Sequence, residues 1–353
     1  MDNPPAQPAP ARQSATGRDQ ELWEPTIHDV LLAQRRIAPH LAPTPLLKPA
    51  ALARALGCEA YVKCENLQPV GAFKVRGGVN LVAALVEQGG PGPAGLATAS
   101  TGNHGQSIAY AAHLFGLRAT IFAPQGANPL KVAAMEALGA DVRLEGQDFD
   151  AAREACEAFV RASGARYVHS MNEPLLIAGV ATAYLEALLA VPDADVVIVP
   201  IGGGSGACGA AIVARALHPA TRVIGVQAEG APAVYRSFHS GRLEATDAAA
   251  TCAEGLATRV AFELPLRILR KHLDEIILIS DMEMLQAMRL LLETTHMVAE
   301  AAGAAATAAA MKLHAELAGL RVVLPITGGN ATAGQLREAL QQQAVGGCYS
   351  ASP

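Results

Sequence analysis

Short apolar runs alternate with longer amphipathic or alanine-rich stretches from about residue 60 onward. The apolar runs have the length and β-branched content of buried strands, and the stretches between them are long enough for helices. We expect strands at 61–62, 95–99, 119–123, 141–144, 195–200, 222–226, 275–279 and 321–325. Helices are expected, among other places, at 73–87, 104–114, 129–138, 150–162, 282–295 and 299–310.

This repeated order of strand and helix predicts an α/β fold with parallel sheets covered by helices on both faces. Glycine-rich loops follow three of the strands and precede helices, at 100–105, 202–209 and 327–330. In open α/β sheets, ligands bind at the carboxyl ends of the strands. We therefore expect the three loops to share one site.

Composition narrows the class of protein. The 353 residues carry 27 basic and 32 acidic side chains, a net charge of −5, and 51% of the residues are hydrophobic. This balance excludes a disordered chain and argues against a nucleic-acid partner. The mean hydropathy of +0.24 comes from alanine and short β-branched runs. Since no apolar run reaches the roughly 20 residues that span a bilayer, we expect no membrane partner.

The six cysteines stand at 58, 64, 156, 208, 252 and 348, and no two form a C-x-x-C pair. Their spacing predicts neither a zinc site nor a disulfide framework, and favours buried thiols in a reducing compartment. Residues 1–20 are rich in Pro, Ala and Gln and lack the pattern of a signal peptide. We expect a disordered tail there and a cytoplasmic protein.

The loop at 202–209 has the features of a phosphate cradle. Four of its first five residues are glycine, so successive N–H groups can line one concavity at a helix N-terminus, and Ser205 adds a hydroxyl. The same loop contains G-x-G-x-x-G, which leaves a dinucleotide site as an alternative. A tight turn with close helix packing is the structural alternative.

Lys74 stands at the start of a predicted helix, between Phe73 and Val75. A helix N-terminus disfavours an ammonium, and partial burial lowers the pKa of a lysine. Both effects favour the neutral amine that forms covalent links to carbonyl groups. Taken alone, Lys74 is equally well explained as a solvated surface lysine.

The segment around Lys74 resembles the signature K-x-E-x-x-Q-x-x-G-S-F-K-x-R-G of fold-type II pyridoxal-phosphate enzymes, the serine/threonine dehydratases and serine racemases. The matching residues are Lys63, Glu65, Gln68, Gly71, Phe73, Lys74, Arg76 and Gly77, and Ala72 replaces the usual serine. The resemblance covers roughly residues 25 to 340 and implies a fold like tryptophan synthase β, with two open, mostly parallel twisted sheets flanked by helices. It further implies that Lys74 holds pyridoxal 5'-phosphate covalently and acts as the catalytic base.

The other loops match the family in order. The 100–106 loop resembles the family's S-x-G-N-H loop, which implies substrate binding by Ser100, Thr101, Gly102, Asn103 and His104. Ser100 or Thr101 is equally well explained as a helix cap, and His104 as a structural histidine. In racemases the position of Thr101 carries a serine that acts as a second acid/base, so Thr101 is a catalytic candidate and racemisation an alternative activity.

Thr327 lies in a segment similar to the family's S-G-G-N. The resemblance implies that Thr327 faces the pyridine nitrogen of the cofactor. A hydroxyl partner leaves that nitrogen neutral, which favours β-elimination over transamination. Glu300 and Gly255 lie in segments similar to the family's E-x-x-G-A and T-x-A-D-G, near cofactor and substrate respectively, although Glu254 replaces the aspartate. The resemblance thus gives the cofactor set Lys74, Phe73, Asn103, Gly202, Gly203, Gly204, Ser205, Gly206, Glu300 and Thr327.

We therefore expect a pyridoxal-phosphate-dependent ammonia-lyase that converts a β-hydroxy-α-amino acid of the serine, threonine or phenylserine type to a 2-oxo acid and ammonia. A racemase, a dinucleotide-dependent oxidoreductase and a regulatory homologue are the alternatives. Gln227 and Ala233 replace the carboxylates of metal-activated relatives, so we expect no metal. We also expect a homodimer, a large cofactor-binding domain over 21–67 and 171–345, and a small domain over 68–170.

Overall fold

Two mostly parallel sheets organise residues 22–342, the part of the chain that this computed structural model describes. The six-stranded sheet has the order β1-β2-β10-β7-β8-β9, and only the β1–β2 pair is antiparallel. Its strands are β1 (Leu46–Leu47), β2 (Glu59–Lys63), β7 (Val196–Pro200), β8 (Arg222–Ala228), β9 (Glu275–Ile279) and β10 (Arg321–Pro325).

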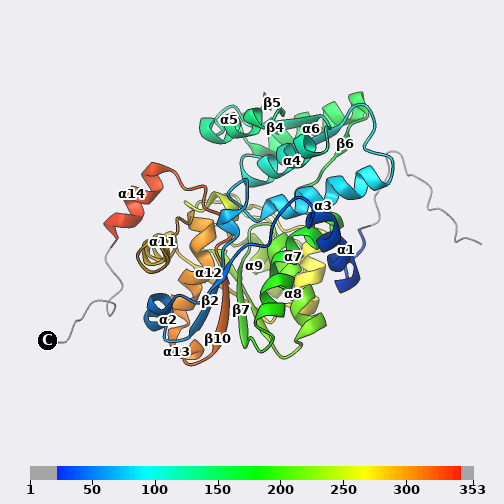
Figure 1. The fold of residues 1–353 in the computed structure, drawn as a ribbon. Helices are drawn as coiled ribbons and strands as arrows, with labels where there is room; N and C mark the ends of the chain where they lie inside the picture. Colours follow the sequence, from blue (N-terminus) through cyan, green and yellow to red (C-terminus); the bar gives the residue numbers. More distant parts are fainter. Residues whose placement is uncertain (1–21, 343–353) are drawn as a thin grey trace, which may run out of the picture.

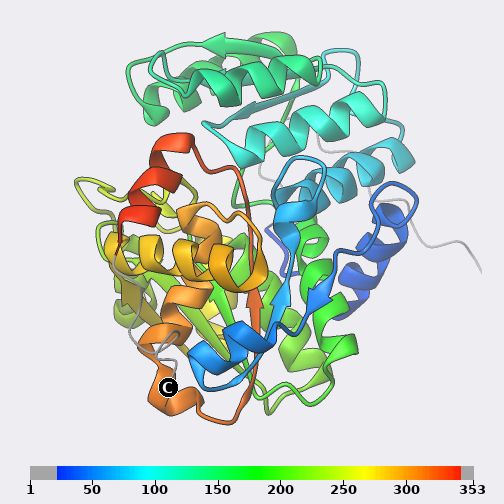
Figure 2. The ribbon, with the colours of Figure 1, turned by 60° about the vertical axis from the view of Figure 1, so that its left-hand side comes forward.

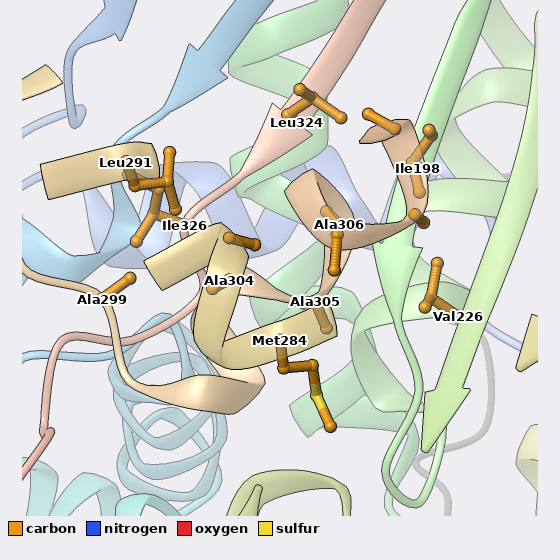
Figure 3. Close-up of a cluster of buried hydrophobic side chains, with 14 of the residues drawn as sticks. Ile198, Val226, Met284, Leu291, Ala299, Ala304, Ala305, Ala306, Leu324 and Ile326 are labelled. Carbon is orange, nitrogen blue, oxygen red and sulfur yellow. The ribbon is translucent and has the colours of Figure 1, made fainter. Parts of the chain in front are cut away.

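The central strand β7 shows why this sheet is buried on both faces. Val196 and Ile198 pack into one hydrophobic cluster, and Val197 and Val199 pack into another on the opposite face. A strand with apolar residues at every position can be covered by helices on both sides, as a parallel sheet requires. Figure 3 shows the first cluster, where Ile198, Val226 and Leu324 face the alanines of helix α12.

Small side chains let α12 (Ala301–Lys312) pack closely between the sheet and α11 (Asp281–Thr295). Every residue of α12 from Ala301 to Ala310 is buried. The predicted alanine-rich helix is therefore confirmed as a core element. The other helices on this face are α2 (Ala50–Leu56), α13 (His314–Leu317) and α14 (Ala333–Gln341), and those on the opposite face include α1 (Ile27–Ile37), α7 (Pro174–Ala190), α8 (Ser205–Leu217), α9 (Ala233–Ser240) and α10 (Glu263–His272).

The second sheet has four strands in the order β5-β4-β3-β6, all parallel. These are β3 (Leu96–Ala99), β4 (Ala119–Ala123), β5 (Asp141–Leu144) and β6 (Arg166–Tyr167), with helices α3 (Lys74–Glu87), α4 (Asn103–Leu114), α5 (Pro129–Ala137) and α6 (Phe149–Ser163). Figures 1 and 2 show these elements as a separate layer above the six-stranded sheet, with α3 between the two.

The α/β class and the two mostly parallel sheets are confirmed, and each expected strand is present. The two-residue strands β1 and β6 were not predicted, because they are too short to produce a hydrophobic pattern. The four-stranded sheet lies within 68–170, and the division into domains stays a prediction. The expected tail over 1–20 and the end of the expected large domain, 343–345, lie outside the described residues. Within 22–342, no helix is both long and apolar enough to cross a membrane.

Candidate active site

Three loops at the carboxyl ends of strands β3, β7 and β10 converge with the start of α3. The chain before α3 pairs with the loop after β10: Ala72 bridges Gly328, and the Phe73 amide donates to the Thr327 carbonyl over 3.0 Å. The Ser107 hydroxyl in α4 donates to the Lys74 carbonyl over 2.6 Å. These contacts position Lys74 where the two sheets meet.

The Lys74 side chain points to the glycine loop after β7. Its Nζ donates to Ser205 Oγ over 2.9 Å and lies 5.3 Å from the centre of the Phe73 ring. Burial lowers the pKa of Lys74 to about 8. The structure therefore rejects the solvated surface lysine and places an amine that is easily deprotonated beside a glycine loop.

The glycine loop 202–206 is closed in by neighbouring residues rather than open to side chains. A Cβ on Gly202 would overlap the Gly255 carbonyl, one on Gly203 would overlap the Met171 thioether, and one on Gly206 would lie 3.2 Å from the Phe73 ring. Gly204 has a φ of 103°, a conformation that favours glycine. Close packing therefore accounts for these glycines, and the feature that suits a phosphate is the set of backbone N–H groups at the N-terminus of α8.

The 100–104 loop turns from β3 into α4. Ser100 Oγ accepts from the Gly105 amide at 2.8 Å and from the Gly102 amide at 3.2 Å, so this side chain shapes the turn. His104 Nε2 lies 2.9 Å from Thr98 Oγ1, and because that hydroxyl donates to Val168 O, the imidazole must donate to it. Burial, followed by the charge of Lys74, lowers the pKa of His104 to about 3. The His104 side chain is a neutral structural group, and only its backbone lies in the loop.

A chain of side chains links the loop after β3 to the loop after β10. Asn103 Nδ2 donates to Glu300 Oε1 over 2.7 Å, and Asn330 Nδ2 donates to Asn103 Oδ1 over 2.8 Å. Asn330 also donates to the Val70 carbonyl over 2.9 Å. Burial raises the pKa of Glu300. Asn330 was not among the expected site residues, although it ends the T-G-G-N segment. Its hydrogen bond fixes the orientation of the Asn103 side-chain amide.

Thr327 and Gly255 border the same region. The Thr327 hydroxyl donates to the Ala302 carbonyl over 3.3 Å, and Gly255 touches the glycine loop through its carbonyl at Gly202. Thr101 is half-buried in the turn between Ser100 and Gly102. Most of the expected site residues thus lie on the three converging loops or at the start of α3, whereas Glu300 directly precedes α12 and Gly255 lies in the turn Glu254–Leu256.

The charged residues of the Lys74 signature form a buried ion cluster instead of facing the site. Arg76 donates to both Glu65 and Glu186, and Lys63 Nζ donates to Glu186 over 2.5 Å. Burial opposes the charge of Arg76, but Glu65 and Glu186 outweigh it and raise the pKa of Arg76. The cluster balances two cations against two anions, and it anchors α3 to α7 and to the turn that follows β2. Glu186 was missed because no local pattern marks it.

Gln227, which stands where metal-activated relatives carry a carboxylate, uses its side-chain amide in a structural hydrogen bond. Gln227 is fully buried at the end of β8, and its Oε1 accepts from the Tyr235 amide over 2.8 Å. Within residues 22–342, no three His, Cys, Asp or Glu side chains are grouped as they would be around a metal ion.

These residues fit pyridoxal phosphate. A half-buried amine with a lowered pKa suits a covalent link to an aldehyde, and the backbone N–H groups of the glycine loop 202–206 at the N-terminus of α8 suit a phosphate. Lys74 and the loop would hold the two ends of the cofactor. Thr327 and Asn103, on two of the converging loops, and Glu300, directly before α12, would border its ring.

Comparison with known proteins agrees with this geometry. Residues 37–328 match the family model described as pyridoxal-phosphate dependent enzyme. The chain is 38% identical to the L-threonine ammonia-lyase of Thermotoga maritima over 305 residues, 86% of this chain and 75% of that protein. It is 36% identical to the β-hydroxyaspartate dehydratase of Paracoccus denitrificans, over 88% of this chain and 97% of that protein.

Among solved structures, maize serine racemase superimposes with a TM-score of 0.84 at 29% identity, over 90% of this chain and 97% of that one. These matches favour the phosphate-cradle interpretation of the loop at 202–209 over a dinucleotide site.

Proposed function

Because the chain belongs to the family of pyridoxal-phosphate-dependent enzymes, we propose that it is an ammonia-lyase acting on a β-hydroxy-α-amino acid. The observation that carries the proposal is the Lys74 amine, which lies 2.9 Å from Ser205 with its pKa lowered to about 8. The similarity to ammonia-lyases and dehydratases supports elimination as the reaction.

When bound, pyridoxal phosphate supplies a ring that withdraws electrons from the substrate's α-carbon. Lys74, whose amine has a lowered pKa, is the group placed to take the α-proton of a bound substrate. The N–H groups at the start of α4, with Ser100 and Asn103, orient the substrate carboxylate. Elimination then removes the α-proton and the β-hydroxyl as water, and hydrolysis of the released product gives a 2-oxo acid and ammonia.

We assign the remaining roles from position. The backbone of 202–206 with Ser205 holds the phosphate, and Phe73 packs on that loop. Asn103 and Glu300 border the cofactor ring, and the Thr327 hydroxyl would turn from the Ala302 carbonyl to the ring nitrogen when the cofactor is bound. His104 and Gly102 contribute backbone groups to the substrate loop, and Gly255 closes the substrate side of the glycine loop.

A panel of L-serine, L-threonine, phenylserine and 3-hydroxyaspartate, with 2-oxo acid and ammonia both measured, tests the proposal. We expect a yellow protein that releases both products from at least one member. A yellow but inert protein would favour the regulatory homologue, and a colourless protein that binds a dinucleotide would refute the proposal.

Racemisation is the second candidate, favoured by the half-buried hydroxyl of Thr101 and by the serine racemase fold match. Thr101 would return a proton to the face of the α-carbon opposite Lys74. Thr101→Ala should then abolish formation of the D-amino acid and the solvent exchange of the α-proton that accompanies it. Thr101→Ser should retain both. Unchanged exchange in Thr101→Ala would remove Thr101 from the catalytic set.

We further propose a cytoplasmic homodimer that needs no divalent cation. Leu67 and Val298 expose 55% and 39% of their surface beside the Asn66 side chain, which donates to the Val298 carbonyl, and this apolar pair suits a subunit contact. The buried free thiols of Cys58, Cys64, Cys156 and Cys208 suit a reducing compartment. Light scattering, cell fractionation, and activity with EDTA or added Mg²⁺ test these three points.

A further inference from the structure

Lys131 carries a buried ammonium that the chemistry above does not use. The residue is 9% exposed and lies in the first turn of α5, where the helix dipole disfavours a cation. Pro129 at the helix start and the Asn128 side chain, which accepts from the Leu130 amide, fix this turn. A lysine held in an unfavourable, buried position needs an anion close by.

The anion that Lys131 has in the structure is easily removed. Within residues 22–342, its ammonium has one hydrogen-bond and ion-pair partner, Glu254, whose side chain is 56% exposed, whereas that of Lys131 is 10% exposed. An ammonium has three N–H donors, so two remain without a protein acceptor. Glu254 can return to water at little cost, but Lys131 cannot.

The Lys131 ammonium lies beside the candidate active site. Lys131 Nζ lies 3.5 Å from where a Cβ on Gly102 would be, beside the loop expected to hold the substrate carboxylate. Lys131 also lines a cavity of about 40 Å³ together with Glu300, Asn330 and Glu254. Of the described residues that line this cavity, Lys131 is the only cation.

A cation at this place would offset the negative charge that the proposed cofactor and substrate bring. Lys74 would hold the cofactor covalently, and the cofactor phosphate and the substrate carboxylate would both bring negative charge to the site. Bringing two anions into a partly buried site without a counter-charge is costly. Lys131 lies beside the 100–104 loop and not beside the glycine loop 202–206, so it serves the carboxylate.

We propose that Lys131 is a substrate-binding residue that exchanges its ion pair with Glu254 for one with the substrate's α-carboxylate. Glu254 is then a competing anion that weakens substrate binding. The inference rests on the proposed function, because it assumes an amino-acid substrate in this site. Lys131 would add a charged group from α5 to the substrate-binding groups of the loop before α4.

The directions in which two substitutions change substrate affinity distinguish this role from that of a purely structural ion pair. If Lys131 binds carboxylate, Lys131→Met weakens binding and Glu254→Gln strengthens it. If the pair only holds the two parts of the protein together, both substitutions weaken binding. The loop that carries Glu254 keeps other anchors, because Asp281 accepts from the Cys252 amide and Arg259 lies 3.6 Å from Asp150.

The experiment titrates the holoprotein with an amino acid and with its amide, which lacks the carboxylate charge, and follows the cofactor absorption. The acid is the panel member that the wild type turns over fastest, or L-serine if none is turned over. For Lys131→Met we expect the apparent Kd of the acid to rise about tenfold or more, as for a lost charged hydrogen bond, with that of the amide unchanged. Lys131→Arg should restore most of the affinity, and Glu254→Gln should lower the Kd of the acid.

Lys271→Met, which removes an exposed lysine paired with Glu24, is the matched control and should leave both Kd values unchanged. Equal weakening of acid and amide, or weaker binding of the acid in Glu254→Gln, would overturn the role of Lys131. Spectral binding without 2-oxo acid release would contradict the proposed function while leaving the test of Lys131 intact. A wild-type spectrum that no amino acid changes would overturn both.

Discussion

The lowered pKa of Lys74 makes a quantitative prediction about cofactor loading. Burial shifts this pKa from the ordinary 10.5 to about 8, which corresponds to about 3 kcal/mol favouring the neutral amine. At pH 7 roughly one amine in ten is then neutral, against about one in three thousand for an ordinary lysine, a gain of about 300-fold. Because only the neutral amine attacks the cofactor aldehyde, loading should be fast at neutral pH.

The assay mixes cofactor-free protein with excess pyridoxal phosphate and follows the rise of visible absorption between pH 6 and 10.5. The loading rate should rise about tenfold per pH unit while Lys74 is mostly protonated, and should level off near pH 8. A lysine-containing peptide in the same assay should keep accelerating until about pH 10. A protein curve that follows the peptide would refute the inference that Lys74 is buried beside Ser205.

Three further substitutions test the packing around the site. Glu186→Gln leaves the two cations of the buried cluster with one anion, and should lower the free energy of unfolding by about 3 kcal/mol in urea titrations. Gly202→Ala drives a Cβ into a backbone carbonyl, and should raise the Kd for pyridoxal phosphate at least about tenfold. Asn330→Ala removes the donor that orients the neighbouring amide, and should lower kcat about tenfold with little change in stability.

Each of the first two substitutions has a matched control. Glu154→Gln removes a glutamate that is 73% exposed, and should change stability by less than about 0.5 kcal/mol. Gly126→Ala adds a methyl group where no atom lies within 4 Å, and should leave cofactor affinity unchanged. Equal effects of a test variant and its control would show that the named contact is unimportant. For Asn330→Ala, an unchanged kcat would show that Asn103 is held in place by Glu300 alone.

The fold could be predicted from the sequence because its central elements have strong local signals. β7 and β10 consist mainly of consecutive apolar residues, as strands buried on both faces should. Clusters of glycines follow both strands and are easily recognised in the sequence. Parallel strands end at the same edge, so three marked loops predict one site. Strands as short as β1 and β6 carry no such signal and depend on their neighbours for their conformation.

The electrostatics of the site could be predicted only in part. A lysine at a helix start hinted at a lowered pKa, and the structure confirms it for Lys74. The partners of buried charges lie far along the chain, however: Glu186 is 123 residues from Lys63, and Glu254 is 123 residues from Lys131. No local pattern reports such pairs. On an amphipathic helix, Lys131 has the same appearance as a solvated lysine.

The most direct test of the account is 2-oxo acid release by the holoprotein and by its Lys74→Ala variant, with Lys48→Ala, an exposed lysine, as the control. The account predicts equal amounts of 2-oxo acid and ammonia from a β-hydroxy-α-amino acid with the wild type and the control. It predicts that Lys74→Ala loses both the product and the visible absorption of the bound cofactor. Product release that survives in Lys74→Ala, or a wild type that is yellow yet inert toward every member of the panel, would contradict it.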